Sequence, residues 1–371
     1  MTGIHLAVAL DGAGWHPAAW RERSARPDEL LDAPYWADVI TEAERGLLDF
    51  VTIEDGLGVQ TPRTDEVVGR PDAVLVAARV APLTSRIGLM PTVIATHTEP
   101  FHISKAIATL DYVSEGRAGL RVKVSASADE ARHFGRREMP LVNPPAAELM
   151  SEAADYIEVV RRLWDSWEDD AEIRDVATGR FVDREKLHYI DFAGSHFSVK
   201  GPSITPRPPQ GQPVVGVLGH RDPVYRLIAS SADVGFVTPR DASHAGEIIA
   251  SIDAPVHVFA DLVVFLGSTV DEAAERKARM DERAGYVYTS DATVFTGTPK
   301  QLAGLLIDWA SAGLSGFRLR PGAIPDDLTF ITRELVPELQ RRGVFREAYE
   351  AETFRGLLGL PRPASRFASP A

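Results

Sequence analysis

Short apolar runs alternate with amphipathic stretches along almost the whole chain. The apolar runs typical of buried strands lie at 5–10, 49–55, 86–96, 119–126, 213–219, 233–239, 256–267 and 316–322. Nearly every run is followed by a stretch with the helical period, such as the long amphipathic segment from Glu148 to Trp167. Strands that alternate with helices in this way predict a parallel sheet with right-handed crossover connections.

Eight strand–helix units favour a closed barrel over an open, doubly wound sheet with a second domain. A dinucleotide-binding fold would need G-x-G-x-x-G after the first strand, and that turn instead carries Asp11 and Gly12. We therefore expect an α/β fold, a (β/α)₈ TIM barrel with insertions at the C-terminal face, formed by residues 1–345 and followed by a C-terminal tail at 346–371. The irregular, Gly- and Pro-rich segment 168–212 is too long for a plain loop. We expect it to be an insertion that covers the barrel mouth.

The fourth predicted strand places two cations close together. Side chains alternate between the faces of a strand, so Arg121, Lys123 and Ser125 share one face. The opposite face is apolar and suits the helix layer, which puts the cations inside the barrel. An unpaired buried charge is very costly, so these cations are either ligand-facing or paired. They form an anion site or a salt-bridge cluster with an acid such as Glu54 or Asp55.

Composition narrows the class of protein. The 371 residues are 44% hydrophobic and 25% charged, with a formal net charge of −13 that disfavours nucleic-acid and anionic-membrane partners. There is no cysteine, which excludes disulfides and thiolate chemistry, and no H-E-x-x-H or other ligand spacing predicts a metal site. The first residues do not resemble a signal peptide, and no apolar run approaches the ~20 residues that span a bilayer. We expect a soluble cytoplasmic protein.

Function in such a barrel lies at the C-terminal ends of the strands. One such turn carries Gly219, His220 and Arg221 just before a helix that begins near Asp222. Backbone amides at a helix start favour an anion, so this turn is a candidate phosphate site. An ordinary loop with a solvated arginine explains the same residues equally well.

Several longer motifs occur in an informative order. They include GWHPAAWR, YWADVITEAERGLLDFVTIED, TSRIGL, THTEPFH, ATLDYVSEGRAG, ADEARHFG, LWDSWEDD and GPSITPRPPQGQPVV. Together they resemble the bacterial-luciferase-like flavin monooxygenases, in the branch of nitrilotriacetate monooxygenase and the dibenzothiophene-sulfone monooxygenases. The resemblance is dense from residue 1 to about 240 and looser beyond.

The resemblance implies a two-component monooxygenase acting on a small organic substrate. Such an enzyme takes reduced FMN from a separate flavin reductase, uses O₂ as co-substrate and forms a flavin C4a-hydroperoxide. It also implies a homodimer or tetramer. Four residues match family positions near the flavin: Asp55, Thr96, Ser125 and Gly219. No catalytic base can be named from the motifs, and the candidates at the barrel mouth are His16 and His97.

The chain departs from the family at several flavin contacts. The family usually has R-A-G-W-N-V-V-T-S where this chain has RAGLRVKVS, and G-S-S-x-x-G where it has Gly219, His220 and Arg221. A Tyr of the third-strand motif is His97. In one account Arg121 and Arg221 bind the phosphate by charge. In the others, the protein is a paralogue with a degraded flavin site and no catalysis, or an F₄₂₀-dependent oxidoreductase of the same superfamily.

Overall fold

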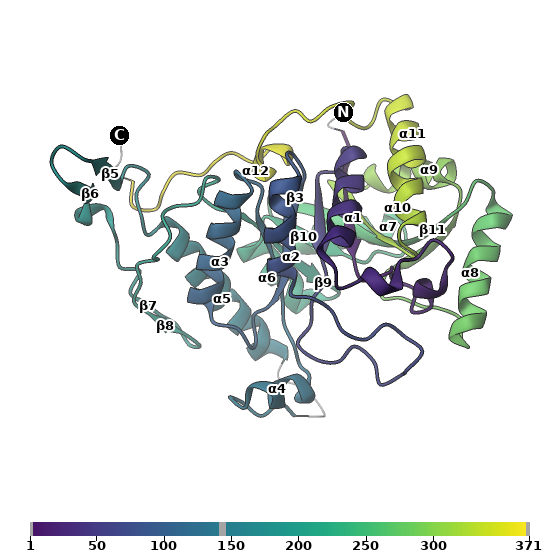
Figure 1. Cartoon of the computed structure of the whole chain (residues 1–371), viewed down its shortest axis with the longest axis horizontal. Helices are drawn as coiled ribbons and strands as arrows, with labels where there is room; N and C mark the ends of the chain where they lie inside the picture. Colours follow the sequence, from purple (N-terminus) through teal and green to yellow (C-terminus); the bar gives the residue numbers. More distant parts are fainter. Residues whose placement is uncertain (1–2, 141–145, 369–371) are drawn as a thin grey trace.

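The computed structural model describes residues 3–140 and 146–368, and its centre is a closed barrel of parallel strands (Figure 1). In the described residues eight strands make the ring: β1 (His5–Leu10), β2 (Phe50–Ile53), β3 (Gly88–Ile94), β4 (Gly119–Lys123), β9 (Val214–Gly219), β10 (Val234–Val237), β11 (His257–Leu266) and β13 (Gly316–Pro321). Each strand pairs in parallel with the next, and β13 pairs back on β1 with His5 opposite Gly316. The predicted (β/α)₈ barrel is confirmed, with all eight strands in their predicted places.

Helices cover the outside of the barrel. They are α1 (Ala33–Arg45), α2 (Ala73–Val80), α3 (Pro100–Val113), α5 (Ala146–Asp165), α6 (Asp222–Ser231), α7 (Ala242–Ile252), α8 (Val270–Ala284), α9 (Pro299–Ala310), α10 (Asp326–Phe330) and α11 (Val336–Arg341), with short 3₁₀ or π turns at Ala19–Arg21, Pro27–Glu29, Ala81–Leu83, Arg184–Lys186 and Ile331–Leu335. The apolar stripe of α5 explains its position, because Tyr156, Val160 and Trp164 recur at helical spacing and are buried. Trp164 Nε1 also donates to the carbonyl of Ser104 at 2.9 Å, which ties α5 to α3.

One strand of the large sheet was not predicted. β12 (Thr293–Gly297) pairs in parallel with the C-terminal half of β11, from Leu262 to Leu266, and so adds to the sheet outside the ring. Most of its side chains are only half-buried. The segment is short and lacks a continuous apolar run, which is why the pattern of hydrophobic positions does not reveal it.

The expectation that segment 168–212 covers the barrel mouth is wrong. The segment forms two small hairpins, β5 (Glu172–Asp175) with β6 (Arg180–Val182), and β7 (Phe192–Ala193) with β8 (Ser198–Val199). It packs on the outer side of α3 and α5 and near the N-terminal end of β4, where Gln210 binds Asp111 and the carbonyl of Ala118. In Figure 1 the mouth is marked by α4 (Ala128–Phe134) at the bottom, whereas β5 and β6 lie at the upper left.

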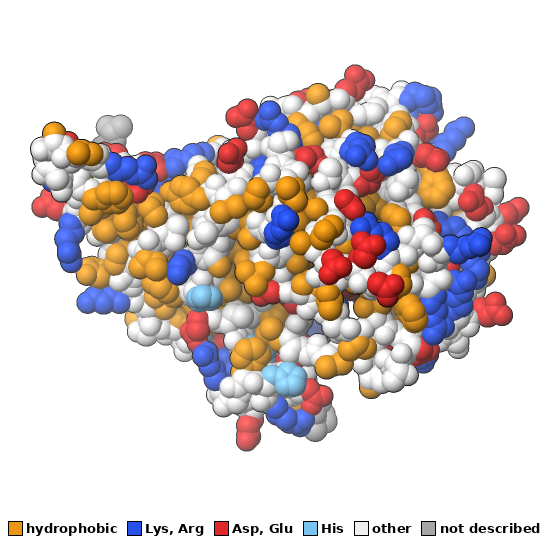
Figure 2. Space-filling model, viewed as in Figure 1, with side chains coloured by type: hydrophobic (Ala, Val, Ile, Leu, Met, Phe, Trp, Pro, Cys, Tyr) orange, Lys and Arg blue, Asp and Glu red, His pale blue; other side chains and the backbone are white. Residues whose placement is uncertain are grey.

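The physical reason is that the segment follows α5. A barrel helix runs opposite to its strands, so a chain leaving its C-terminal end emerges at the face away from the mouth. The tip of the first hairpin is exposed there: Val176 is 95% and Phe181 65% exposed, and Figure 2 shows apolar side chains at this end of the molecule.

The segment after α11 closes the end of the barrel opposite the mouth. α12 (Phe354–Leu357) inserts Phe354 beside Phe50, with ring centroids 4.9 Å apart. Gly88 and Gly119 make room for this ring, since a Cβ at either position would lie within 3 Å of it. The mouth is therefore the end at which a ligand can enter. Within the described ranges, no helix combines the length and apolar character needed to cross a membrane.

Candidate active site at the barrel mouth

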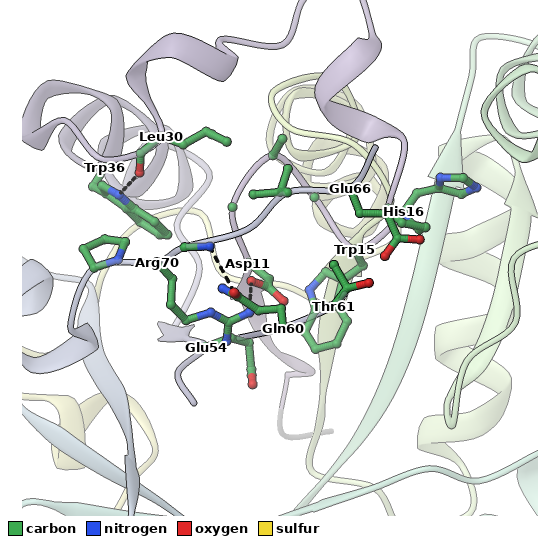
Figure 3. A pocket seen from close by; sticks show the side chains of 17 residues that line it. Asp11, Trp15, His16, Leu30, Trp36, Glu54, Gln60, Thr61, Glu66 and Arg70 are labelled. Carbon is green, nitrogen blue, oxygen red and sulfur yellow. Dashed lines mark hydrogen bonds and ion pairs between the residues drawn. The ribbon is translucent and has the colours of Figure 1, made fainter. Parts of the chain in front are cut away.

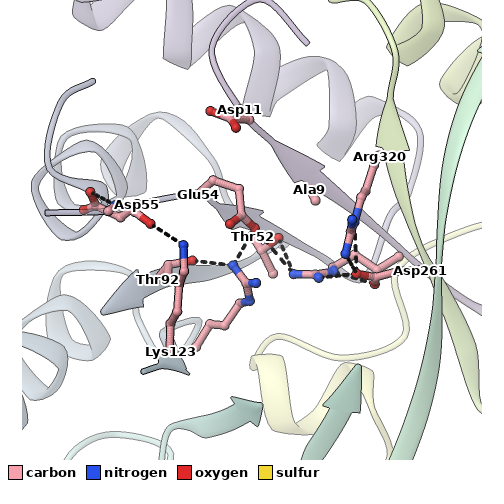
Figure 4. Close-up of polar contacts among 12 residues, drawn as sticks. Ala9, Asp11, Thr52, Glu54, Asp55, Thr92, Lys123, Asp261 and Arg320 are labelled. Atoms are coloured by element: carbon pink, nitrogen blue, oxygen red, sulfur yellow. Dashed lines mark hydrogen bonds and ion pairs between the residues drawn. The ribbon is translucent and has the colours of Figure 1, made fainter. Parts of the chain in front are cut away.

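Arg121 and Glu54 form a buried ion pair in the floor of the mouth (Figure 4). Arg121 Nη1 donates to Glu54 Oε1 at 2.5 Å and to Thr92 Oγ1 at 2.9 Å, and the two charged residues are only 3% and 8% exposed. Burial raises the pKa of the Glu54 carboxyl, but Arg121 and Arg318 outweigh that effect and lower it to about 2. The prediction that the fourth-strand cations point inward is confirmed. Of the two alternatives for Arg121, the structure has the salt bridge.

A second buried cluster lies beside the first. Arg318 Nε donates to Asp261 Oδ1 at 2.8 Å, Arg320 Nη2 donates to Asp261 Oδ2 at 2.5 Å, and Arg320 also binds Asp291 at 2.6 Å. Arg318, Arg320 and Asp261 are at most 1% exposed. Burial raises the pKa of Asp261, and the two guanidinium groups reverse this and lower it. Figure 4 shows this cluster next to Thr52, which accepts from Arg318.

Lys123 shares the inward face of β4 with Arg121 but has different surroundings. Its side chain is exposed in the mouth, and Nζ donates to the backbone carbonyl of Asp55 at 3.1 Å. No carboxylate of the described ranges lies within ion-pairing distance of Nζ. Burial of its stem lowers the pKa of the ammonium, and the Glu54 carboxylate partly opposes this.

The predicted cofactor contacts Asp55, Thr96 and Ser125 all lie at the mouth end of their strands. Thr96 Oγ1 accepts from the Ser125 backbone N–H at 2.9 Å, and Ser125 Oγ accepts from the N–H of Ser127. The Asp55 carboxylate accepts from the N–H of Gly56 and, at 2.9 Å, from that of Ala73, which opens α2. These side chains therefore fix the strand ends, and the two hydroxyl protons are left to donate outward.

The two candidate histidines differ in how their nitrogens are used. His16 Nδ1 accepts from the Ala18 N–H and Nε2 donates to Asp281, both at 3.1 Å, so both nitrogens have partners. His97 is 6% exposed and stacks on Phe134 at 5.1 Å, and its Nε2 has no partner in the described part of the chain. Burial lowers the pKa of both imidazoles. Only His97 has a nitrogen left for a ligand.

The turn between β9 and α6 holds the three residues predicted to bind a phosphate. His220 Nδ1 lies 3.0 Å from Thr238 Oγ1, and its Nε2 is 3.6 Å from Asp291. Arg221 is exposed, and its side chain makes no hydrogen bond to the residues described. Gly219 has a packing explanation, since a Cβ there would lie 3.0 Å from Ile228. Arg221 is thus the free cation of this turn.

A cleft of about 300 Å³ opens beside the ion pairs, between the loop after β1 and the loop that precedes α2 (Figure 3). Arg70 Nη2 binds Asp11 Oδ1 at 3.0 Å within it. Burial raises the pKa of Asp11 to about 6, although Arg70 opposes the rise. The Trp15 ring lies under Arg320, with the guanidinium carbon 4.5 Å from the ring centre. The cleft therefore combines aromatic walls with a titratable acid.

Residues 15–304 match the family model of luciferase-like monooxygenases. The chain belongs to this family. The resemblance stated from the motifs is thereby confirmed.

Individual relatives in this family match the chain over almost their whole length. It is 31% identical to N-acetyl-S-(2-succino)cysteine monooxygenase of Bacillus subtilis (strain 168), covering 98% of both chains. It is 29% identical to nitrilotriacetate monooxygenase component A of Aminobacter aminovorans, covering 99% of this chain and 98% of the relative. The solved structure of the long-chain alkane monooxygenase LadA superposes with a TM-score of 0.87 at 24% identity, over 97% of this chain and 96% of the other. That structural likeness supports the fold.

The residues at the barrel mouth fit a flavin. In the described part of the chain, five buried side-chain nitrogens lack a hydrogen-bond partner, and three of them belong to Arg70, His97 and Arg121 at the mouth. The two Nε–H groups can only donate, so they suit a ligand rich in acceptors. The carbonyl oxygens, ring nitrogens and phosphate of a flavin mononucleotide supply such acceptors. Buried donors left unpaired are costly, which favours a ligand that pairs them.

Proposed function

We propose that this protein is the oxygenating component of a two-component monooxygenase. It takes reduced FMN from a separate flavin reductase and uses O₂ to transfer one oxygen atom to a small organic substrate. The observation that carries the proposal is the set of three buried nitrogens at the mouth that lack partners in the described part of the chain, next to a cleft of about 300 Å³. One relative supports it by name, since nitrilotriacetate monooxygenase component A is one component of a larger system.

Each group at the mouth has a role in this proposal. Bound reduced FMN would supply the chemistry that activates O₂. Thr96 would lie beside its ring and Ser125 near its phosphate end, and Arg221 would bind the phosphate. His97, with one unused nitrogen and a lowered pKa, would be neutral at pH 7 and able to donate or accept a proton at Nε2. The aromatic walls of the cleft would exclude water from the reacting centre.

Binding of three cofactors tests the proposal. The protein is titrated with FMN, with reduced FMN under anaerobic conditions and with F₄₂₀, and binding is followed by fluorescence quenching or calorimetry. Micromolar binding of reduced FMN is the expected result. A preference for F₄₂₀ would support an F₄₂₀-dependent oxidoreductase instead, and binding of none of the three would support a barrel with a degraded flavin site.

The phosphate assignment has its own control. We expect Arg221→Ala to weaken FMN binding while leaving riboflavin binding unchanged. Arg226→Ala is the matched variant, because Arg226 is an exposed arginine further along the same helix. Equal loss of FMN and riboflavin in Arg221→Ala would contradict the assignment. Light scattering would test the homodimer or tetramer that we also propose.

A further inference from the structure

The two cations on the inward face of β4 differ in their partners: Arg121 is paired with a carboxylate, and Lys123 is not paired with any in the described ranges. The charge of Arg121 is paired with Glu54 at 2.5 Å inside the barrel floor. Lys123 lies one layer nearer the mouth, and its only hydrogen bond among the described residues is to the backbone carbonyl of Asp55. A ligand that enters the mouth therefore meets the charge of Lys123 and not that of Arg121.

No carboxylate of the described ranges forms an ion pair with Lys123. Glu54 binds Arg121, Asp11 binds Arg70 at 3.0 Å, and Glu130 accepts from the backbone N–H of Leu57 at 3.2 Å. These three acids, with Arg70 and Arg121, are the charged groups that affect the ammonium. In the described ranges the Glu130 carboxylate has no cation partner, but it lies beyond ion-pairing distance of Lys123 Nζ. Burial lowers the pKa of its ammonium, and the nearby Arg121 and Arg70 add to this effect.

The position of Lys123 points to the flavin as the missing anion. Its Nζ touches the backbone of Asp55, and Ser125 follows two residues later on the same face of the strand. Both residues are among those matched to flavin contacts. Reduction of the neutral flavin ring by two electrons with uptake of one proton leaves the ring with one negative charge, which the oxidised ring lacks.

We propose that Lys123 is the cation that holds the anionic ring of reduced FMN, so that this protein binds reduced FMN more tightly than oxidised FMN. The inference rests on the proposed function and adds to it a preference for one redox state. Lys123 acts as a binding residue, and a bound flavin would displace the water that otherwise screens its charge.

The experiment compares oxidised and reduced FMN on wild type, Lys123→Met, Lys123→Gln and Lys123→Arg. We expect Lys123→Met to weaken reduced FMN about tenfold and oxidised FMN much less, because only the reduced ring is charged. This difference corresponds to a fall of about 30 mV in the midpoint potential of the bound flavin for a two-electron couple. Lys123→Gln should behave in the same way, and Lys123→Arg should keep most of the preference.

Lys300→Met is the matched control, since Lys300 is an exposed lysine at the start of α9, outside the mouth. It should leave both affinities unchanged. Equal effects of Lys123→Met and Lys123→Gln on the two redox states, or no effect on either, would overturn the inference while leaving the proposed function in place. Failure of the wild type to bind reduced FMN would instead overturn the proposed function, and that result appears before any variant is made.

Discussion

The two halves of the barrel interior are built from opposite kinds of side chain. The half away from the mouth is filled by Phe50, Met90, Phe236, Phe259 and Phe354. The half towards the mouth is filled by three arginines and two acids: Arg121, Arg318, Arg320, Glu54 and Asp261. The same strands supply both halves, since Phe259 and Asp261 are neighbours on one face of β11. Two residues along the same strand, the interior therefore changes from apolar packing to ion pairing.

This difference shows what the charged half is for. Well-packed apolar residues are often at least as stabilising as buried ion pairs, so stability alone does not require charges here. The apolar half closes the barrel, while the charged half gives the mouth a rigid floor. The five charged residues of that floor form ion pairs with one another. Lys123, one layer nearer the mouth, has no carboxylate partner among the described residues. The following variants test this division.

The largest effect is expected at the acid shared by two arginines. Asp261→Asn should lower the free energy of unfolding by about 5 kcal/mol, because Arg318 and Arg320 lose their common counter-charge inside the barrel. Denaturant unfolding would measure it. Asp291→Asn, a half-exposed partner of Arg320, should cost only about 1 kcal/mol. Equal losses in the two variants would show that burial does not matter to this cluster.

Phe354→Ala tests the apolar half. The variant should lower the free energy of unfolding by about 4 kcal/mol, because it leaves a cavity beside Phe50. Gly88 and Gly119, which also line this cavity, have no side chains to fill it. Phe181→Ala, at a ring that is 65% exposed, is the control and should change the unfolding free energy little. A small loss in Phe354→Ala would mean that the barrel floor is held together without α12.

The Glu54 ion pair should make the free energy of unfolding depend on pH. Its pKa falls from an ordinary value of 4.5 to about 2, so the folded state gains about 3 kcal/mol above pH 4.5, and this gain disappears as the pH falls towards 2. The gap in stability between wild type and Glu54→Gln should therefore be wide at pH 7 and close in acid. A gap that does not change with pH would contradict the assigned ion pair.

Asp11 should give a smaller effect with the opposite sign. Its pKa is raised to about 6, so the wild type loses stability as the pH rises from about 4 to about 6, when the acid ionises in its buried position. Asp11→Asn should lack that loss. After a discount for the third of the side chain that solvent reaches, the difference is about 1 kcal/mol, measurable by thermal unfolding across this pH range. A profile parallel to that of the wild type would contradict it.

The sequence carried most of the fold because its strands are apolar and regularly spaced. All eight ring strands, and the inward direction of Arg121, follow from period and parity alone. β12 and the position of segment 168–212 do not follow, because one is a short half-buried strand and the other depends on the end of α5 from which the chain leaves.

The site was only partly visible in the sequence. The sequence does not show whether Glu54 or Asp55 is the partner of Arg121. Neighbouring residues on a strand point to opposite faces, and which of the two points inward depends on where the strand ends. The Asp261 cluster was missed, although an acid inside the long apolar run at 256–267 and the spacing of Arg318 and Arg320 carried the same parity signal as the fourth strand. The roles of His16 and His97 required knowledge of which nitrogens already have partners.

The packing of α12 into the end of the barrel opposite the mouth also affects how the chain folds during synthesis. Phe50 belongs to the second strand to leave the ribosome, yet its packing partner Phe354 is translated near the end of the chain. β1 likewise waits for β13 before it has a neighbour on each side. The early strands of a nascent chain therefore cannot complete their interior, and contacts so distant in sequence form slowly. This protein is accordingly expected to spend its translation as an open, incomplete barrel, a state in which chaperones have apolar surface to bind.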